Sequence, residues 1–402
     1  MFFITLFLDP KNLTNYCFIQ KNNKYINSSH QPTYCITMKQ IKLFIATISV
    51  LLLNANHVFA CTGITLTAGD SSVVVARTTE WGASATHNYY VVSPRGQHYT
   101  SYTPTGENGL SFRAQYGYVA IATETARFAV EGINERGLSA GLFFFPNYGK
   151  YTAYNPANNH RTLCDMQFVS WVLSSFATID QLTSAIDSID LVAIHPDMGT
   201  VHWRISEPSG RIIVVECIDG KVHIYENPLG VLTNAPDFEW HMTNLNNYVN
   251  LYPGETASMR LNDSVTLRAF GAGAGMLGIP GDVTPPSRFI RAAIYQSTAP
   301  TPSSAEDAVL SCFHILNNFD IPIGIEHADR QVPDSLPSAT QWTSASDLHN
   351  LLFYYRTAWN STIRCIDLRT IPFDKTTFQS YPLDATKRQP IEMIRIKPNP
   401  RR

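Results

Sequence analysis

The sequence lacks the short motifs by which metal and redox sites are usually recognised. It contains no CxxC pair and no HExxH motif, and its 12 histidines are scattered along the chain. Cysteines or histidines at fixed short spacings are the usual ligands of zinc. We therefore expect no metal ion and no cofactor in this protein.

Charge is also sparse, at 15% of the 402 residues. Residues 61–402 hold 25 Lys and Arg against 31 Asp and Glu, a net charge of −6. A mildly acidic body offers no electrostatic footprint for nucleic acid, so we expect no nucleic-acid partner. The apolar content of 44% is that of an ordinary globular protein. No linker of domain-boundary quality follows residue 61, which predicts a single domain over 61–402.

No apolar run near the N-terminus is long enough to cross a membrane. The run Leu43–Leu53 has eleven residues, whereas a spanning helix needs about 20. It follows two lysines and precedes Val58-Phe59-Ala60, which places small residues where a signal peptidase reads them. The pattern predicts a signal peptide over 38–60, no stable membrane insertion, and a periplasmic or secreted product.

Residues 1–37 lie upstream of this complete export signal. They are rich in Asn, Tyr and Phe and show no sustained periodicity. We interpret them as a non-native or disordered N-terminal extension, with Met38 as the true start.

Cleavage after Ala60 would make Cys61 the first residue, so that one residue carries a thiol and a free α-amine. Five cysteines remain after the cut, and an odd number leaves at least one thiol unpaired. They are Cys61, Cys164, Cys217, Cys312 and Cys365. The same segment loosely resembles a lipoprotein signal. In that alternative, Cys61 is acylated and the protein is a lipid-anchored, non-catalytic binding protein.

Strand and helix patterns alternate in blocks along residues 61–402. Two antiparallel sheets packed face to face, with helices outside, would satisfy this order. The expected strands are 64–67, 71–76, 89–92, 118–123, 128–130, 137–145, 200–206, 211–218, 221–226, 339–346, 351–357 and 363–367. The expected helices lie within 163–176, 178–189, 239–251, 287–296 and from Ser303 onward, with capping boxes at Thr178 and Ser303.

Four segments together resemble the choloylglycine hydrolase and penicillin V acylase family of linear-amide hydrolases. They are 61–63 with 77–82, 132–142, 202–203 with 230–248, and 277–289; the tail 354–368 adds to the likeness. The resemblance covers almost all of 61–402. It implies an α+β fold, the four-layer αββα sandwich of two antiparallel sheets of N-terminal nucleophile hydrolases. It also implies a small-molecule amide substrate, and relatives are often homotetramers.

The resemblance implies a role for each matching residue around the thiol. Cys61 would be the nucleophile, and its own α-amine would take the thiol proton. Arg77 would lie by the thiol, where positive charge favours thiolate. Glu80 would hold the α-amine; better-known members have Asp at this position.

The oxyanion and the substrate would be held by a second set of residues. Asn234 would donate its side-chain amide to the oxyanion, and the backbone N–H of Phe143 would be the second donor. Arg288 matches the last arginine of the family site. Trp81, Phe143 and Phe144 would line an apolar pocket for an acyl group.

The substrate class is inferred from the signal peptide and from one residue of the family motif. The family cleaves conjugated bile salts, penicillin V and, in some exported members, acyl-homoserine lactones. The signal peptide and the aromatic Phe143, where bile-salt enzymes have Asn, favour the penicillin V or acyl-homoserine lactone type. A conjugated bile salt hydrolase is the alternative. A papain-like protease is excluded by the absence of a matching His motif.

Overall fold

A computed structural model of the chain describes residues 3–8, 15–21, 34–37, 59–194, 199–327, 332–333 and 336–397. The chain divides into two units, Met1–His57 and Val58–Arg402. In the first unit, an antiparallel sheet joins β1 (Phe3–Leu8), β2 (Asn15–Lys21) and β3 (Tyr34–Thr37). The predicted signal peptide lies outside the described residues up to Val58.

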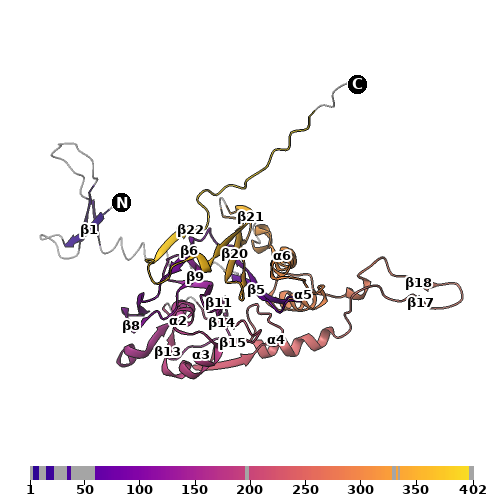
Figure 1. The fold of residues 1–402 in the computed structure, drawn as a ribbon, viewed down its shortest axis with the longest axis horizontal. Coiled ribbons are helices and arrows are strands. Elements are labelled where there is room, and N and C mark those ends of the chain that lie inside the picture. Colours follow the sequence, from indigo (N-terminus) through magenta and orange to yellow (C-terminus); the bar gives the residue numbers. More distant parts are fainter. Residues whose placement is uncertain are drawn as a thin grey trace. The chain divides into compact units, whose positions relative to one another are not determined.

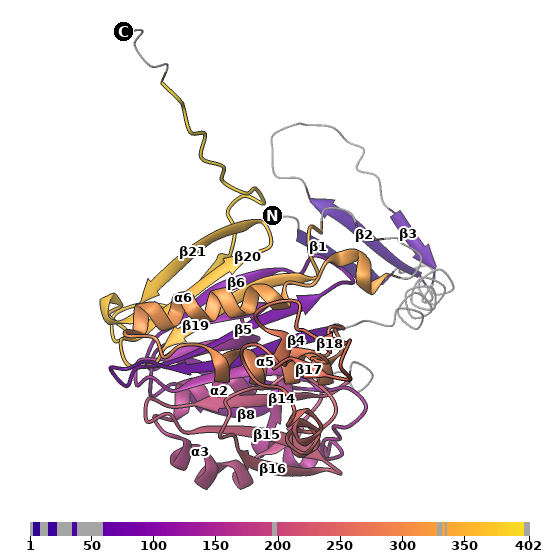
Figure 2. The same cartoon turned by 90° about the vertical axis from the view of Figure 1, so that its right-hand side faces the viewer.

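The second unit is built on two antiparallel sheets (Figures 1 and 2). One has eight strands in the order β16-β15-β14-β11-β10-β9-β6-β22, and the other has five in the order β21-β20-β19-β5-β4. The eight strands are β6 (Asn88–Ser93), β9 (Tyr118–Thr123), β10 (Ala129–Asn134), β11 (Ser139–Phe144), β14 (Val201–Ser206), β15 (Ile212–Ile218), β16 (Lys221–Glu226) and β22 (Gln379–Pro382). The five are β4 (Phe59–Thr67), β5 (Val73–Trp81), β19 (Thr340–Asp347), β20 (Leu352–Thr357) and β21 (Asn360–Asp367).

Helices cover the outer face of each sheet. Helix α2 (Phe168–Ser175) packs on β10 and β11, and α3 (Ile179–Ala185) follows it. On the other side, α5 (Pro285–Thr298) and α6 (Ala305–Leu316) pack on β4 and β5, as Figure 2 shows. The order is helix, sheet, sheet, helix, which confirms the predicted α+β sandwich.

The space between the sheets is filled by apolar side chains from both. Val75 and Trp342 of the five-stranded sheet join Val119 and Ile133 of the eight-stranded sheet in one buried cluster. Burial of this apolar surface is the main force that holds the two sheets together. It fixes β4 and β5 against β11, so residues of different sheets meet near Cys61.

Helices α3 and α6 each begin directly after a residue whose side-chain hydroxyl caps the first turn. The Thr178 hydroxyl accepts from the Gln181 N–H, and Ser304, not the predicted Ser303, accepts from the Asp307 N–H at the start of α6. Helix α4 (Phe238–Asn244) is shorter than expected, since the chain continues as a 3-10 turn, Leu245–Tyr248.

Several short strands were not predicted. The hairpin β7 (His98–Thr103) and β8 (Gly106–Arg113) is largely polar, and β22 adds an edge to the larger sheet. Two further pairs are β12 (Thr162–Cys164) with β13 (Asp190–Val192), and β17 (Met259–Arg260) with β18 (Thr266–Leu267). Figure 1 shows the β17–β18 hairpin at the tip of an arm that projects from the sandwich.

The part of the chain that the structure describes contains no helix both long and apolar enough to cross a membrane.

Candidate active site

The antiparallel register of β4 and β5 brings Cys61 next to Arg77. Cys61 lies opposite Thr79, and Gly63 lies opposite Arg77. The Nη2 atom of Arg77 lies 2.7 Å from the Cys61 Sγ atom. The predicted strands 64–67 and 71–76 thus form one hairpin, and Arg77 lies by the thiol as the resemblance implies.

Arg77 is buried between the sheets and is held there by the strands opposite. Its Nη1 atom donates to the Leu142 carbonyl and lies 3.5 Å from Glu131 Oε2. Its guanidinium carbon lies 4.0 Å from the centroid of the Phe143 ring, a cation–π distance. These contacts fix the positive charge against the thiol.

Gly63 leaves room for this packing. A Cβ atom there would lie 2.6 Å from Arg204 Nη1 and 2.9 Å from the Phe143 ring. Both neighbours are buried, so neither can move aside cheaply. Only glycine therefore fits two residues after the thiol.

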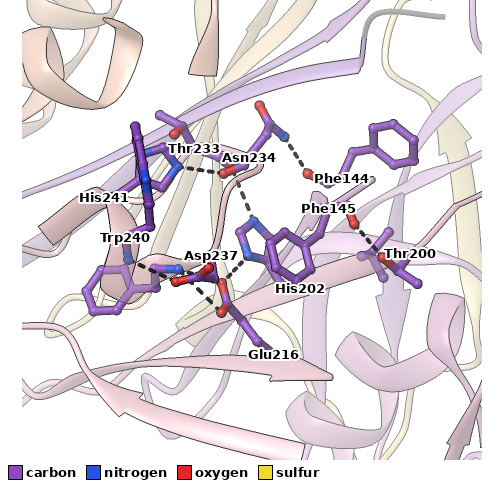
Figure 3. Close-up of polar contacts among 12 residues, drawn as sticks. Phe144, Phe145, Thr200, His202, Glu216, Thr233, Asn234, Asp237, Trp240 and His241 are labelled. Atoms are coloured by element: carbon purple, nitrogen blue, oxygen red, sulfur yellow. Dashed lines mark hydrogen bonds and ion pairs between the residues drawn. The ribbon is translucent and has the colours of Figure 1, made fainter. Parts of the chain in front are cut away.

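Asn234 reaches Cys61 from the loop after β16. Its Oδ1 atom accepts from the Cys61 backbone nitrogen at 2.9 Å and from Arg288 Nη2 at 2.6 Å. Its Nδ2 atom donates to the Phe144 carbonyl at 2.8 Å (Figure 3). The amide predicted to bind an oxyanion thus lies beside Cys61, and its donor nitrogen is bonded to the Phe144 carbonyl.

Arg288, and not its neighbour Arg291, points into the site from α5. Its Nη1 atom contacts the Cys61 carbonyl and donates to Thr62 Oγ1 at 2.8 Å. Arg291 instead donates to the carbonyls of Pro280 and Asp282. Arg288 therefore ties α5 to both Cys61 and Asn234.

Glu80 is buried on the face of β5 opposite to Arg77, because strand residues three apart point to opposite faces. It lies opposite Ala60 and accepts from Thr340 Oγ1 at 3.3 Å, while its Oε2 atom has no hydrogen bond within the described residues. Burial raises the Glu80 pKa to about 8, and Arg288 opposes the rise. Arg77 also lowers the Glu80 pKa, but neither arginine donates a hydrogen bond to Glu80 within the described residues.

The backbone N–H that faces the thiol belongs to Phe144, not to Phe143 as predicted. This N–H lowers the pKa of Cys61 by hydrogen bonding, although burial, the largest influence, raises it. Arg77 and Arg288 also lower the Cys61 pKa, and Glu80 raises it. A one-residue shift along a strand reverses the face, so motif matching alone missed the correct N–H.

The three aromatic residues predicted to line an acyl pocket differ in exposure. The Phe143 side chain is fully buried beneath Arg77, so it is core and not an open pocket wall. Phe144 and Trp81 are partly exposed, and the Trp81 indole N–H donates to Ser84 Oγ. Trp81 and Phe144 remain the candidates for acyl contact.

Three buried residues that the sequence did not single out support the Asn234 loop (Figure 3). His202 Nδ1 lies 2.8 Å from Glu216 Oε1, and its Nε2 lies 3.2 Å from the Thr233 carbonyl. His241 Nε2 lies 2.8 Å from the Asn234 carbonyl, and burial lowers the His241 pKa to about 4. A neutral His241 donates to Asn234 and fixes the loop. Only tertiary contacts reveal these roles.

Within the described ranges, no group of three or more His, Cys, Asp or Glu side chains could hold a metal ion. The chemistry available at Cys61 is that of a buried thiol with two arginines, a carboxylate and amide donors around it.

The model of the choloylglycine hydrolase family, linear amide C–N hydrolases, matches residues 61–381 and so begins at Cys61. A bile salt hydrolase/transferase of Clostridium perfringens is 32% identical over 277 residues, which are 68% of this chain and 82% of the relative. A penicillin V acylase of Pectobacterium atrosepticum is 23% identical over 323 residues, 75% of this chain and 78% of the relative.

Solved structures show the same fold. A mutant conjugated bile acid hydrolase from Clostridium perfringens has a TM-score of 0.70 at 28% identity, covering 83% of this chain and 100% of that one. A penicillin V acylase from Agrobacterium tumefaciens has a TM-score of 0.66 at 23% identity, covering 81% and 92%.

Proposed function

Because the chain belongs to the choloylglycine hydrolase family of linear amide C–N hydrolases, we propose that Cys61 is its nucleophile and acts as an N-terminal residue. The observation that supports this best is the surroundings of Cys61. Arg77 lies 2.7 Å from its sulfur, and Asn234 accepts from its nitrogen at 2.9 Å. Four buried groups meet there, namely the Cys61 thiol, the guanidinium groups of Arg77 and Arg288, and the Asn234 amide, and such interacting groups cluster at functional sites.

The reaction divides into acylation and hydrolysis. The free α-amine of Cys61 takes the thiol proton, directly or through water, and the thiolate attacks the amide carbon. The Asn234 side-chain amide and the Phe144 N–H donate to the oxyanion, and the amine leaves with a proton. Water then cleaves the acyl-thioester and restores the thiol. Arg77 favours the thiolate, and Glu80 holds the α-amine.

We propose that the cut which frees Cys61 accompanies export to the periplasm or beyond. The support is the order of features in the sequence: two lysines, a short apolar run and small residues just before Cys61. The start of the family match at Cys61 agrees with this.

For substrate, we propose the penicillin V or acyl-homoserine lactone type. This chain has aromatic residues at both positions that follow Gly141-Leu142, namely Phe143 and Phe144. The resemblance implies Asn at the first of these two positions, Phe143, in the bile-salt type. Export also favours this type over the bile-salt enzymes, which are mostly cytoplasmic.

A conjugated bile salt hydrolase is the second candidate, and the relatives favour it. The Clostridium perfringens bile salt hydrolase/transferase is 32% identical, whereas the Pectobacterium atrosepticum penicillin V acylase is 23% identical. The two candidates are separated by comparing the turnover of three substrates by one preparation of the protein. The substrates are glycocholate, penicillin V and a long-chain acyl-homoserine lactone. Clear preference for glycocholate would reverse our proposal.

The alternative from another class is a lipid-anchored binding protein with acylated Cys61. The structure gives a reason against it, because Cys61 is 5% exposed and its sulfur contacts Arg77. A diacylglyceryl group on that sulfur would have to displace the buried guanidinium.

We also propose a homotetramer. The arm around β17 and β18 exposes large apolar side chains, including Met259, Leu261, Leu267 and Phe270. Apolar side chains gathered on a projecting segment favour association. Sedimentation velocity of the parent and of Phe270→Ser with Leu267→Ser tests this; a parent that sediments as a monomer would refute it.

The first experiment is the intact mass of protein purified from an exporting Gram-negative host. A mass that matches residues 61–402 with an unmodified N-terminus supports the mechanism, and an added lipid or an uncut chain contradicts it. Cys61→Ser should then abolish amide hydrolysis while Cys365→Ser, at an exposed cysteine of β21, should not. Equal activity of Cys61→Ser and the parent would rule out the nucleophile.

A further inference from the structure

A second carboxylate, that of Glu326, stands at the end of β5 near Glu80. It closes the 3-10 turn Ile323–Glu326, and a Cβ atom at Gly82 would lie 2.0 Å from its Oε2 atom. The His327 ring, next along the chain, lies 3.0 Å from the Gly82 carbonyl. The turn is therefore packed directly on the strand that carries Arg77 and Glu80.

The oxygens of Glu326 are buried, and neither has a hydrogen-bond partner within the part of the chain described. The charged groups facing it are His327 from its own turn, Arg288 from α5 and Glu80 from β5. Burial raises the Glu326 pKa to about 7, while His327 and Arg288 oppose this. The Glu326 charge in turn raises the pKa of Glu80.

Arg288 acts electrostatically on both acidic side chains of the uncut chain, and Arg77 acts on Glu80, but neither arginine donates a hydrogen bond to them within the described residues. Arg288 is already engaged with Asn234, Thr62 and the Cys61 carbonyl. A cut after Ala60 would create an ammonium group at Cys61, one strand position from the Ala60–Glu80 pair. That ammonium supplies the positive charge that the pair of carboxylates lacks.

We propose that Glu326 is a positioning residue that, through Glu80 and Arg288, controls the charge at the α-amine of Cys61. The inference rests on the proposed function, in which that amine is the base. The ammonium keeps Glu80 ionised in the cut protein, so the charge of Glu326 adds to the potential that stabilises the ammonium. The negative charge of Glu326 therefore raises the pKa of the α-ammonium group, which must lose a proton before the amine can act as a base.

The test compares the cut parent with Glu326→Gln, Glu326→Ala and Glu326→Asp. Glu392→Gln, an exposed residue of the C-terminal tail, is the matched control. Two pH profiles are measured: kcat/KM for penicillin V, and the rate of Cys61 alkylation by iodoacetamide, followed by mass spectrometry of the N-terminal peptide. The second profile needs no turnover.

Loss of the Glu326 charge should move the acid limb of both profiles down by roughly 0.5 to 1 pH unit, with little change at the plateau. Glu326→Asp should restore most of the parent profile, and Glu392→Gln should leave it unchanged. Acid limbs that stay in place or move up in Glu326→Gln and Glu326→Ala overturn the proposal. A parent that cleaves no amide refutes the proposed function, while the alkylation profile still decides the role of Glu326.

Discussion

The sulfur of Cys61 lies 2.7 Å from the Nη2 atom of Arg77, a residue sixteen positions later on the neighbouring strand. The hairpin of β4 and β5 creates this contact, and Leu142, Glu131 and the Phe143 ring hold the guanidinium in place. Burial raises the pKa of the Cys61 thiol, and the positive charge of Arg77 opposes this rise.

Replacement of Arg77 by Gln should raise the pKa of the thiol and lower kcat/KM by about tenfold or more, since one pKa unit corresponds to about 1.4 kcal/mol. The pH dependence of Cys61 alkylation measures the shift. Arg127→Gln, at an exposed arginine, is the control. A thiol that titrates as in the parent would show that Arg77 serves only to pack the core.

Asn234→Ala should reduce turnover about 10²–10³-fold, because one oxyanion donor is lost. The substitution also removes the acceptor of the Cys61 nitrogen. Steady-state kinetics with penicillin V measures the loss, and Asn318→Ala, in the 3-10 turn Asn317–Phe319 after α6, is the control. A change confined to KM would contradict the oxyanion role.

The different environments of the partly exposed Phe144 and the buried Phe143 lead to a prediction about specificity. Phe144→Asn should raise the ratio of glycocholate to penicillin V turnover, because it removes an aromatic side chain that is a candidate for contact with the acyl group of penicillin V. Phe143→Asn should instead destabilise the fold by about 3 kcal/mol or more, since it buries an amide beneath Arg77. Thermal unfolding and competition between the two substrates separate these effects. A turnover ratio that Phe144→Asn leaves unchanged would contradict a role of Phe144 in acyl contact.

The raised pKa of Glu80 predicts that the stability of the uncut protein depends on pH differently from that of the cut protein. In a chain that begins at Val58, the folded Glu80 pKa of about 8 lies well above the unfolded value of about 4.3. The folded state then retains a proton that the unfolded chain releases, so stability is greatest below pH ~4 and falls as pH rises toward 8.

The melting temperature of the uncut chain should therefore fall between pH 5 and pH 8 more than that of the cut chain, whose ammonium lowers the Glu80 pKa. Glu80→Gln should flatten the uncut profile. Parallel profiles for the uncut chain with and without Glu80 would contradict this account.

Local pattern was sufficient for the elements that position the nucleophile. The strand patterns over 64–67 and 71–76 predicted two strands, and the structure confirms them as the β4–β5 hairpin. The meander β14–β16 is confirmed for the same reason. The hairpin β7–β8 was missed because its polar strands bury few side chains and give little apolar alternation.

The supporting residues of the site could not be read from the sequence. Glu326 and His241 matter only because distant segments bring them against Gly82 and the Asn234 carbonyl. The Phe143 or Phe144 choice depends on strand register, which is fixed by packing of both sheets and not by a run of three phenylalanines.

Strand β4 begins at Phe59, before the proposed cleavage point, and this bears on when the leader is removed relative to folding. Ala60 is fully buried and Cys61 nearly so, and the bond between them lies within a paired strand. A peptidase needs its substrate extended and accessible, so under the proposed function the leader must be removed before the sheet closes. A molecule that folds in the cytosol would then be trapped as an inert zymogen, and secretion itself would serve as the activating step.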